Sequence, residues 1–373
     1  MAKKKEKQLE KEVRKPLKFP GSCQYSLCVP STIIRDSNAR NLEQITHIAY
    51  QVAKVATIFN VLEIIILDIA TDTTENHENI SEVGDSRSNT KRIKFDDDEH
   101  NLSNTRKEIQ SPSPDENESA KENKGVLFAT LLQYFVTPPY LVKTTFADEK
   151  YKKKLKYAKS LPKISTLPFM SNNEVFKNFR EGITLSSSLL RSHSHNRQKS
   201  LPETNFVNVG RKRAFELDQK VPTNVRVTVD LRNRKIVSPT SAYGVVGAKL
   251  SFGYYVRFCN RFSSLFTQSP FPEGYTSSVY VNSDDYFNAN DSIPERCSIA
   301  SKLPQHIEQE NGKILLIIGN YLDFERSFQS DRDNLPSVTS VAQFFDSELS
   351  IPKGTRIEDA ALITMSILKS ASH

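Results

Sequence analysis

The feature that most constrains the fold is an α/β pattern near the N-terminus that breaks off before it is complete. Residues 24–29 are an apolar run closed by Pro30, residues 42–59 carry apolar side chains at helical spacing, and residues 61–67 are nearly all aliphatic. Such an aliphatic run is typical of a parallel strand covered on both faces. The alternation of strands and helices normally continues at once, but here it stops at Ala70 and resumes near Ser251. We therefore expect an α/β domain split by a large insertion.

The charge of the chain is strongly segregated along the sequence. The formal net charge is +7, yet residues 1–18 carry +5, residues 70–125 carry −6 and residues 126–245 carry +13. The two α/β pieces, residues 19–69 and 246–373, together carry −5. A segment at +13 favours a polyanionic partner. A solvated basic surface on an ordinary domain is the alternative.

The segments outside the α/β pieces differ in composition. Residues 1–18 interleave Lys and Glu and predict a basic disordered arm, and residues 70–125 are too polar to form a core, which predicts a disordered acidic insertion. Residues 126–245 open with a helical pattern at 126–135 and then become β-rich, with clean alternation at 224–231. Short strands with a basic face favour a small barrel of the oligonucleotide-binding (OB) type. The candidate RNA-binding residues on it are Arg211, Lys212, Arg213, Arg226, Arg232, Arg234 and Lys235.

The second α/β piece has its own predicted elements. We expect strands at 254–257, 277–281, 313–318 and 341–345, and a helix at 258–266. The final helix opens at Thr355–Glu358, a pattern that predicts a capping box. It is apolar on nearly all sides, so it is expected to be packed in the core or in a subunit interface.

The sequence does not predict a membrane span or a metal site. No apolar run approaches the ~20 residues needed to cross a bilayer, and Cys23, Cys28, Cys259 and Cys297 lack metal-ligand spacing. His193 and His195 lie in a serine-rich loop and are interpreted as a chance pair. The basic runs 3–5 and 91–94 resemble nuclear-import signals.

Several stretches together resemble one known family. They are residues 19–68, Leu131–Tyr140, 179–183, 206–210, 226–231, 237–239, 253–257, 269–275, 313–320 and 355–368, and they cover most of the chain outside 1–18, 70–125 and 184–205. Their order resembles the SPOUT methyltransferases, in particular the archaeal–eukaryotic branch with a barrel inserted after the first strands. The resemblance implies a doubly wound parallel sheet with a C-terminal trefoil knot, S-adenosylmethionine as cofactor, and a homodimer. It also implies an RNA substrate, with ribosomal RNA expected, and a location in the nucleus, including the nucleolus.

The same resemblance assigns roles to individual residues. It places Gly319, Asn320, Phe345, Asp346 and Thr355 around the cofactor. Where the family reads Gly-Thr-Ser-Glu-Arg-Gly, residues 280–285 of this chain read Tyr-Val-Asn-Ser-Asp-Asp, so Asp284 replaces an arginine and is the candidate catalytic residue. Asp284, Asp285 or Glu358 could accept a proton. The plainer interpretations are helix capping for Glu358 and a solvent-facing turn for the aspartate pair.

Two functions follow from this pattern. The first is an S-adenosylmethionine-dependent RNA methyltransferase, in which proximity and orientation supply most of the catalysis because the sulfonium is already activated. The second is an RNA-binding or ribosome-assembly factor that keeps the fold but has lost turnover, since reversal of charge at Asp284 opposes binding of a polyanion. An unrelated α/β protein is the third possibility. Titration with S-adenosylmethionine separates these interpretations.

Overall fold

A computed structural model describes residues 23–69, 123–167, 169–170, 177–185, 203–243, 253–283 and 312–371. The predictions made for the arm at 1–18, for the acidic insertion up to residue 122, for His193 and His195 and for Cys297 lie outside these residues, as do both basic runs.

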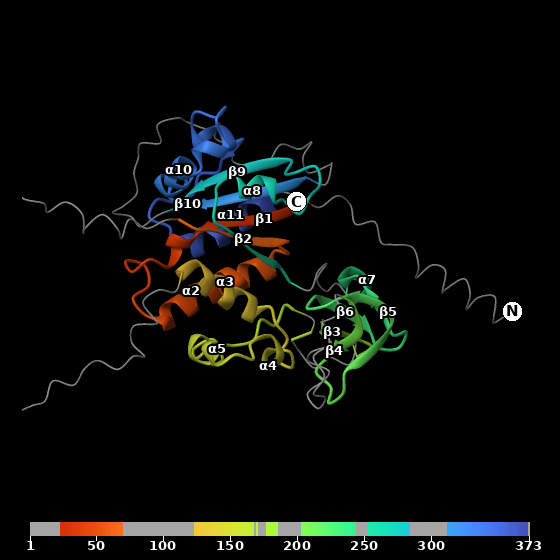
Figure 1. The fold of residues 1–373 in the computed structure, drawn as a ribbon. Coiled ribbons are helices and arrows are strands. Elements are labelled where there is room, and N and C mark those ends of the chain that lie inside the picture. Colours follow the sequence, from red (N-terminus) through yellow and green to blue (C-terminus); the bar gives the residue numbers. More distant parts are fainter. Residues whose placement is uncertain are drawn as a thin grey trace, which may run out of the picture. The chain divides into compact units, whose positions relative to one another are not determined.

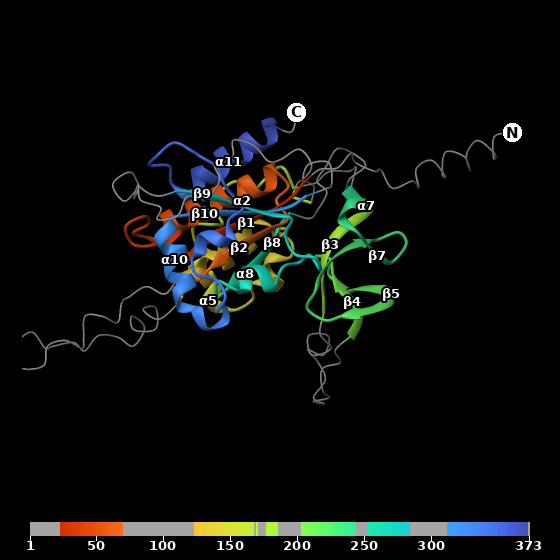
Figure 2. The same ribbon diagram turned by 90° about the horizontal axis from the view of Figure 1, so that it is seen from above.

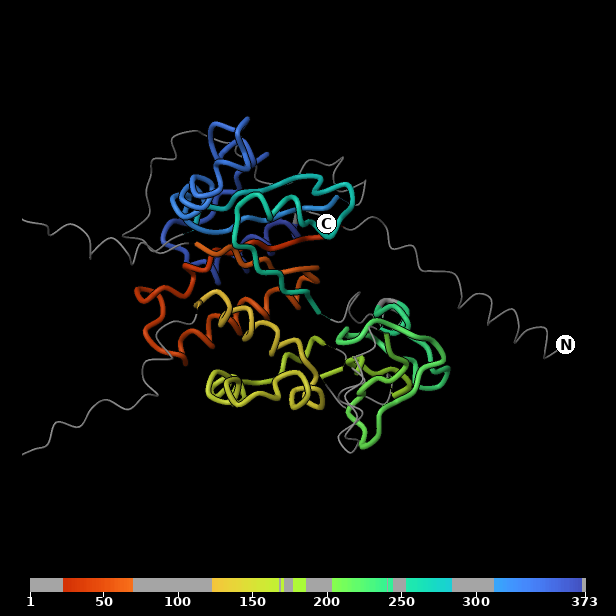
Figure 3. The backbone as a smooth tube through the Cα atoms, viewed as in Figure 1, coloured from red at the N-terminus to blue at the C-terminus, as the bar shows by residue number. Residues whose placement is uncertain are grey.

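A six-stranded parallel sheet forms the larger body of the described chain (Figure 1). Its strand order is β11-β9-β10-β1-β2-β8. The strands are β1 (Gln24–Pro30), β2 (Glu63–Leu67), β8 (Tyr255–Cys259), β9 (Ser277–Asn282), β10 (Lys313–Gly319) and β11 (Ser347–Glu348). Two strands precede the predicted interruption and four follow it, and β1 pairs directly with β10. The sequence pieces on the two sides of the insertion thus complete one sheet, whose backbone path can be followed in Figure 3.

Helices cover both faces of this sheet, because alternate strand residues point to opposite sides. One apolar cluster contains Leu27, Ile64 and Leu316 of the sheet, and it lies under α2 (Leu42–Ile58), α3 (Lys124–Phe135) and α11 (Ile357–Ala371). A second cluster contains the neighbouring strand residues Cys28, Ile65 and Ile317, and it lies under α8 (Ser264–Thr267) and α10 (Tyr321–Ser330). Figure 2 shows α11 and α2 on one side of the sheet and α10 and α8 on the other.

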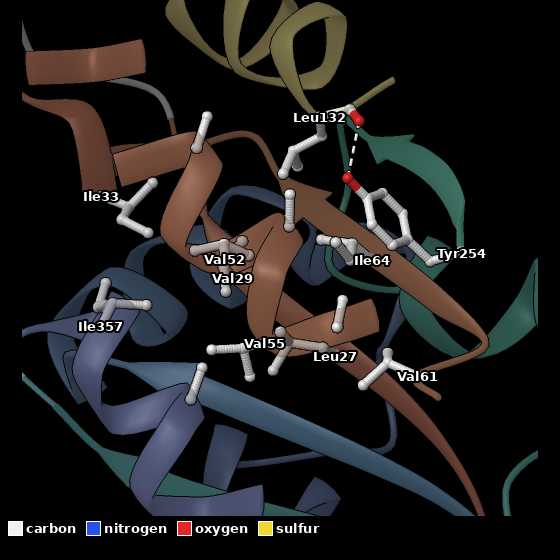
Figure 4. Packing of buried hydrophobic residues seen from close by; sticks show 14 of the residues in the cluster. Leu27, Val29, Ile33, Val52, Val55, Val61, Ile64, Leu132, Tyr254 and Ile357 are labelled. Atoms are coloured by element: carbon white, nitrogen blue, oxygen red, sulfur yellow. Dashed lines mark hydrogen bonds between the residues drawn. The ribbon is translucent and has the colours of Figure 1, made fainter. Parts of the chain in front are cut away.

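The first cluster is the larger core, and it is held by side chains that the sequence pattern placed on one helix face. Val52 and Val55 of α2 pack against Leu27 and Ile64 of the sheet (Figure 4). The hydroxyl of Tyr254 donates a hydrogen bond to the carbonyl oxygen of Leu132, at 2.7 Å, which satisfies a polar group inside this core.

A second, antiparallel sheet lies between the two halves of the first in the sequence. Its order is β5-β4-β3-β6-β7, with β3 (Phe179–Thr184), β4 (Glu203–Asn208), β5 (Phe215–Pro222), β6 (Arg226–Asp230) and β7 (Lys235–Val237), followed by the short helix α7 (Pro239–Tyr243). The backbone N–H of Asp218 donates to the carbonyl oxygen of Arg234 at 3.1 Å, so the two edge regions approach each other. The sheet is therefore nearly closed and barrel-like, around Val207, Val209, Leu217 and Val229.

The residues between α3 and this sheet do not belong to the barrel. They form α4 (Val142–Thr145), α5 (Glu149–Lys154) and a series of turns. Leu155, Ala158, Ile164 and Leu167 are buried in the larger core of the parallel sheet. The β-rich part of the insertion thus extends from β3 to β7, whereas the sequence predicted one insertion domain over 126–245.

Two local predictions for the second α/β piece are wrong. Phe258 and Cys259 continue β8, because they pair with Ile66 and Leu67 of β2, and the helix is limited to α8. Residues 341–344 form the 3₁₀ helix η7 (Val341–Phe344) instead of a strand, because the Ser340 hydroxyl caps this turn by accepting from the N–H of Ala342. The last strand is β11, farther along the chain.

The final helix begins later than the predicted capping box requires. Helix α11 starts at Ile357, so Arg356 rather than Thr355 precedes its first residue. The Thr355 hydroxyl donates to the carbonyl oxygen of Pro352 at 2.5 Å, and Glu358 pairs with Arg356 at 3.0 Å. The helix is also less uniformly buried than expected, since Leu362 is 43% exposed. Among the described residues, no helix is long and apolar enough to cross a membrane.

Candidate functional site

The strand order locates a candidate site at the carboxyl edge of the parallel sheet. From β1 the sheet extends through β2 and β8 in one direction and through β10, β9 and β11 in the other. Open α/β sheets bind ligands outside the carboxyl ends of their strands, where the strand order reverses. Here that point lies between β1, which ends at Pro30, and β10, which ends at Gly319.

Gly319 allows the backbone to pass close to β1 at this point. A Cβ atom added to Gly319 would lie 2.9 Å from Cγ of Pro30 and 3.2 Å from Cε2 of Phe324. Its carbonyl oxygen accepts from the Tyr280 hydroxyl and from the N–H of Ser283, both at 3.1 Å. Close packing of two strand ends therefore explains why a glycine stands here. Its predicted contact with a cofactor stays a prediction.

Ser283 joins the ends of β9 and β10 to the segment before α11, and the sequence analysis did not single it out. It follows β9 directly and is 2% exposed. Its N–H reaches Gly319 at the end of β10, and its hydroxyl donates to the carbonyl oxygen of Thr355 at 2.7 Å, in the segment after β11. Gly319 and Thr355, two predicted cofactor residues, are thus brought together. The signal in the sequence is only a small polar residue at a strand end.

Asn320 begins the helix that follows β10. Its side-chain oxygen accepts from the N–H of Leu322 at 2.9 Å and so caps α10. Capping therefore gives this asparagine a structural role. Whether it also contacts a cofactor stays a prediction.

Phe345 and Asp346 contact other parts of β9. Phe345 stacks on Tyr280, with ring centroids 4.8 Å apart, so it reaches the strand ends through that ring. The Asp346 carboxylate accepts from the N–H of Ser278 at 2.8 Å, near the start of β9. Because Gly319 pairs with the other end of β9, Asp346 lies toward the opposite end of this strand. The role of both residues in cofactor binding stays a prediction.

Two arginines that the sequence analysis did not select lie beside the strand ends. Arg35 follows the 3₁₀ helix η1 (Ser31–Ile34) and pairs with Asp323 of α10 at 2.9 Å. Arg356 donates to the carbonyl oxygen of Asn38 at 3.1 Å. Each of the two side chains is more than a third exposed, at 36% and 37%. Each arginine has a carboxylate partner, Asp323 for Arg35 and Glu358 for Arg356, and both guanidinium groups stay partly exposed near the candidate site.

The predicted RNA-binding residues of the barrel-like sheet fall into two groups. Arg211, Lys212 and Arg213 are exposed in the connection between β4 and β5, and Arg232 and Lys235 are exposed as well. Arg226 instead pairs with the fully buried Glu181 at 3.1 Å and donates to the carbonyl oxygen of Val136 at 2.8 Å. Arg234 pairs with Glu216 at 3.2 Å and with Asp218 at 3.6 Å.

Glu181 is the centre of a buried polar cluster behind Arg226. It accepts from the Thr228 hydroxyl at 2.6 Å and from the Tyr243 hydroxyl at 2.9 Å. Burial, together with the charge of Glu181, raises the pKa of Tyr140 to about 12 and raises the pKa of Tyr243 as well. These phenols therefore stay protonated at neutral pH and serve as donors to the cluster.

The candidate catalytic residue Asp284 and its neighbour Asp285 lie outside the described residues. Glu358, the other candidate proton acceptor, is 6% exposed and pairs with Arg356. Within the described ranges, no three His, Cys, Asp or Glu side chains are grouped so that they could hold a metal ion.

An open parallel sheet whose strand ends meet at one edge is the architecture of an α/β ligand-binding domain, and comparison with known proteins makes the class specific. Residues 24–368 match the family model described as "Putative RNA methyltransferase", and the chain belongs to this family. It is therefore a methyltransferase by family.

Similar proteins are found in yeast and in animals. "Putative methyltransferase YMR310C" of Saccharomyces cerevisiae is 35% identical over 96% of this chain and 97% of its own length. "Putative methyltransferase YGR283C" of the same yeast is 32% identical, over 92% of this chain and 87% of its own length. The "28S rRNA (uridine-N(3))-methyltransferase" of Homo sapiens is 28% identical over 41% of this chain and 39% of its own length.

Proposed function

We propose that this protein transfers a methyl group from S-adenosylmethionine to ribosomal RNA, with a uridine as the modified base. The observation that carries the proposal is that Ser283 joins the ends of β9 and β10 to the segment before α11, beside the reversal point of a parallel sheet, in a chain of this family. The rRNA methyltransferase relatives in animals support the substrate class.

The strand ends fit S-adenosylmethionine in their chemistry. The segments after β10 and β11 are proposed to contact the adenine and the ribose through backbone groups. Arg35 or Arg356 would face the carboxylate of the methionine part, since both guanidinium groups are partly exposed there. When bound, the cofactor supplies a methyl group on an activated sulfonium, so the task of the protein is to orient the acceptor.

Methylation at a ring nitrogen of uridine requires that a proton be removed from that nitrogen. Glu358 suits this role poorly, because its carboxylate is buried and held by Arg356. Asp284 follows Ser283 in the sequence and remains our candidate for the proton acceptor. The exposed basic residues Arg211, Lys212 and Arg213 are proposed to contact RNA phosphates.

The finer features of the fold belong to the same proposal. On one side of β1 the strands follow in the order β10, β9, β11, and this order supports our proposal of a C-terminal trefoil knot. The nearly closed antiparallel sheet supports an OB-type barrel. We further propose a homodimer formed in part through α11, and a nuclear or nucleolar location, where ribosomal RNA is made.

The alternative is an RNA-binding assembly factor that lacks turnover, and the observation that favours it is the aspartate at position 284. Isothermal titration with S-adenosylmethionine, followed by incubation with ribosomal RNA and mass analysis of the nucleosides, distinguishes the two. An enzyme binds the cofactor and yields a methylated uridine. Binding of RNA without any methylated product would favour the assembly factor.

A further inference from the structure

A lysine-rich segment between α3 and the barrel-like sheet has no role in the function described so far. Residues 143–163 contain eight lysines and only two acidic residues, Asp148 and Glu149. The segment comprises the end of α4, all of α5 and the turns that follow. Its net charge of +6 is therefore close to half of the +13 carried by residues 126–245.

This segment is anchored on the parallel-sheet body. Leu155 and Ala158 are 1% and 2% exposed and belong to its larger core. Tyr151 packs edge-on against Phe146, with ring centroids 5.3 Å apart. Because the apolar side chains fix the backbone, the lysines between them are held on the outer side, where Lys150, Lys152, Lys153, Lys156, Lys159 and Lys163 are exposed.

Much of the positive charge of the segment is uncompensated within the described chain. Lys150 pairs with Asp148 at 3.4 Å, and Lys152 pairs with Glu149. Among the described residues, no carboxylate lies within ion-pair distance of Lys153, Lys156 or Lys159. Like charges held this close repel one another unless an external anion neutralises them.

The composition of this surface suits RNA better than an acidic protein. None of the large apolar side chains that the described chain exposes lies within residues 143–163. Protein interfaces usually need such an anchor and are depleted in lysine, whereas contacts to a phosphate backbone need only cations at suitable spacing. Two of the predicted RNA-binding cations of the barrel-like sheet, Arg226 and Arg234, are held in internal ion pairs, so an exposed lysine cluster outside the barrel adds to the cations that stay exposed there.

We infer that residues 143–163 form a binding surface for the phosphate backbone of the RNA substrate. The inference rests on the proposed function and extends it, because it adds a second RNA contact, at the lysine-rich segment, to the one proposed at the barrel. The surface recognises phosphate charge and does not read base identity.

The test uses the full chain and a structured ribosomal RNA fragment. Fluorescence anisotropy is measured from about 50 mM to about 300 mM salt, a range over which counterion release is resolved. The variant Lys153→Gln/Lys156→Gln/Lys159→Gln removes three charges, and Lys153→Arg/Lys156→Arg/Lys159→Arg keeps them as the matched control. Thermal melting establishes that each variant is folded.

We expect the glutamine variant to bind RNA at least about tenfold more weakly, with a salt slope reduced by about 2 to 3, and the arginine variant to bind as the unmodified chain does. Unchanged RNA affinity in the glutamine variant would overturn the inference. A glutamine variant that keeps RNA binding but loses binding to polyglutamate would overturn it in favour of an acidic protein partner. If the unmodified chain binds no RNA, both this inference and the proposed function fail. If the glutamine variant binds and methylates RNA as fully as the unmodified chain, only this inference fails.

Discussion

At the scale of single residues, Ser283 is the side chain on which the candidate site depends most. The substitution Ser283→Ala removes the hydrogen bond to the carbonyl oxygen of Thr355 and leaves the backbone bond to Gly319 in place. Since one such bond contributes about 1 kcal/mol, we expect S-adenosylmethionine to bind about threefold to tenfold more weakly. Isothermal titration measures this. Ser366→Ala, on an exposed position of α11, is the control, and equal affinities for both variants would argue against the site.

Asp331 gives a prediction for pH dependence. Burial alone would raise the pKa of its carboxyl group, but hydrogen bonds from Ser263 and Asn334 outweigh it and lower the pKa below the ordinary 3.8. A pKa that is lowered in the folded state adds stability above the unfolded value, and this stability is lost as pH falls through the folded value. Asp331→Asn should therefore cost about 1 to 2 kcal/mol at pH 7 and less near pH 3. Urea unfolding at both pH values measures this, and an equal loss at both would contradict it.

Contacts within the protein give some predicted site residues a role that the sequence did not show. Gly319 was predicted to contact the cofactor, which stays a prediction, and the structure gives a different reason for a glycine there, because an added Cβ would lie 2.9 Å from Pro30. Ser283 and Arg356 were missed, because their partners, Thr355 and Asn38, are distant in sequence. Arg226 was predicted to bind RNA, but its partner Glu181 could not be known without the strand register.

At the scale of elements, a buried polar cluster ties β2, β8 and the start of β9 together. Arg257 pairs with Glu63 at 3.0 Å, and the Tyr275 hydroxyl donates to Glu63 at 2.6 Å. The substitution Tyr275→Phe removes the hydrogen bond that the Tyr275 hydroxyl donates to the Glu63 carboxylate. It should lower the free energy of unfolding by about 1 to 2 kcal/mol. Tyr50→Phe, which keeps the ring contact with Phe135, is the control. Equal stability of the two variants in chemical denaturation would show that the hydroxyl contributes nothing.

Strongly patterned helices and strands were predictable from sequence, but the two-residue strand β11 and the capped turn before it were not. The helix at 42–59 and the aliphatic strand at 313–318 correspond to α2 and β10. β11 has two residues and forms because Ser347 and Glu348 meet β9, so nothing in its own sequence marks it as a strand. The prediction at 341–345 failed for a related reason, because local capping by Ser340 determined the conformation there.

At the scale of the whole molecule, the proposed homodimer assigns a role to the outer face of α11. Leu362 is 43% exposed, and Ile363 and Ile367 are half-buried beside it. Leu362→Asp should shift a dimer to monomers without unfolding the protomer, because its side chain is not in the core. Sedimentation at micromolar concentration measures this, and Ile58→Asp, a similarly exposed change on α2, is the control. A sole 42.3 kDa species for the unmodified chain would exclude the dimer.

The split parallel sheet could be anticipated, but the packing of residues 124–167 could not. Apolar strand patterns before residue 70 and after residue 251 predicted one domain that is split in the sequence. The direct pairing of β1 with β10 agrees with this prediction. Residues 124–167 resemble part of a basic insertion because their charge is like that of the barrel, yet their apolar side chains pack in the core of the parallel sheet. Charge sums cannot reveal this, because they ignore which residues are buried.

The central claim is that this chain methylates RNA at the strand-end site. The most direct measurement is transfer of radiolabelled methyl groups from S-adenosylmethionine to ribosomal RNA by the purified full chain, with digestion of the RNA to nucleosides. The account predicts label in a methylated uridine, and a lower rate of transfer with Ser283→Ala. A folded chain that binds both cofactor and RNA but leaves every nucleoside unlabelled would contradict it.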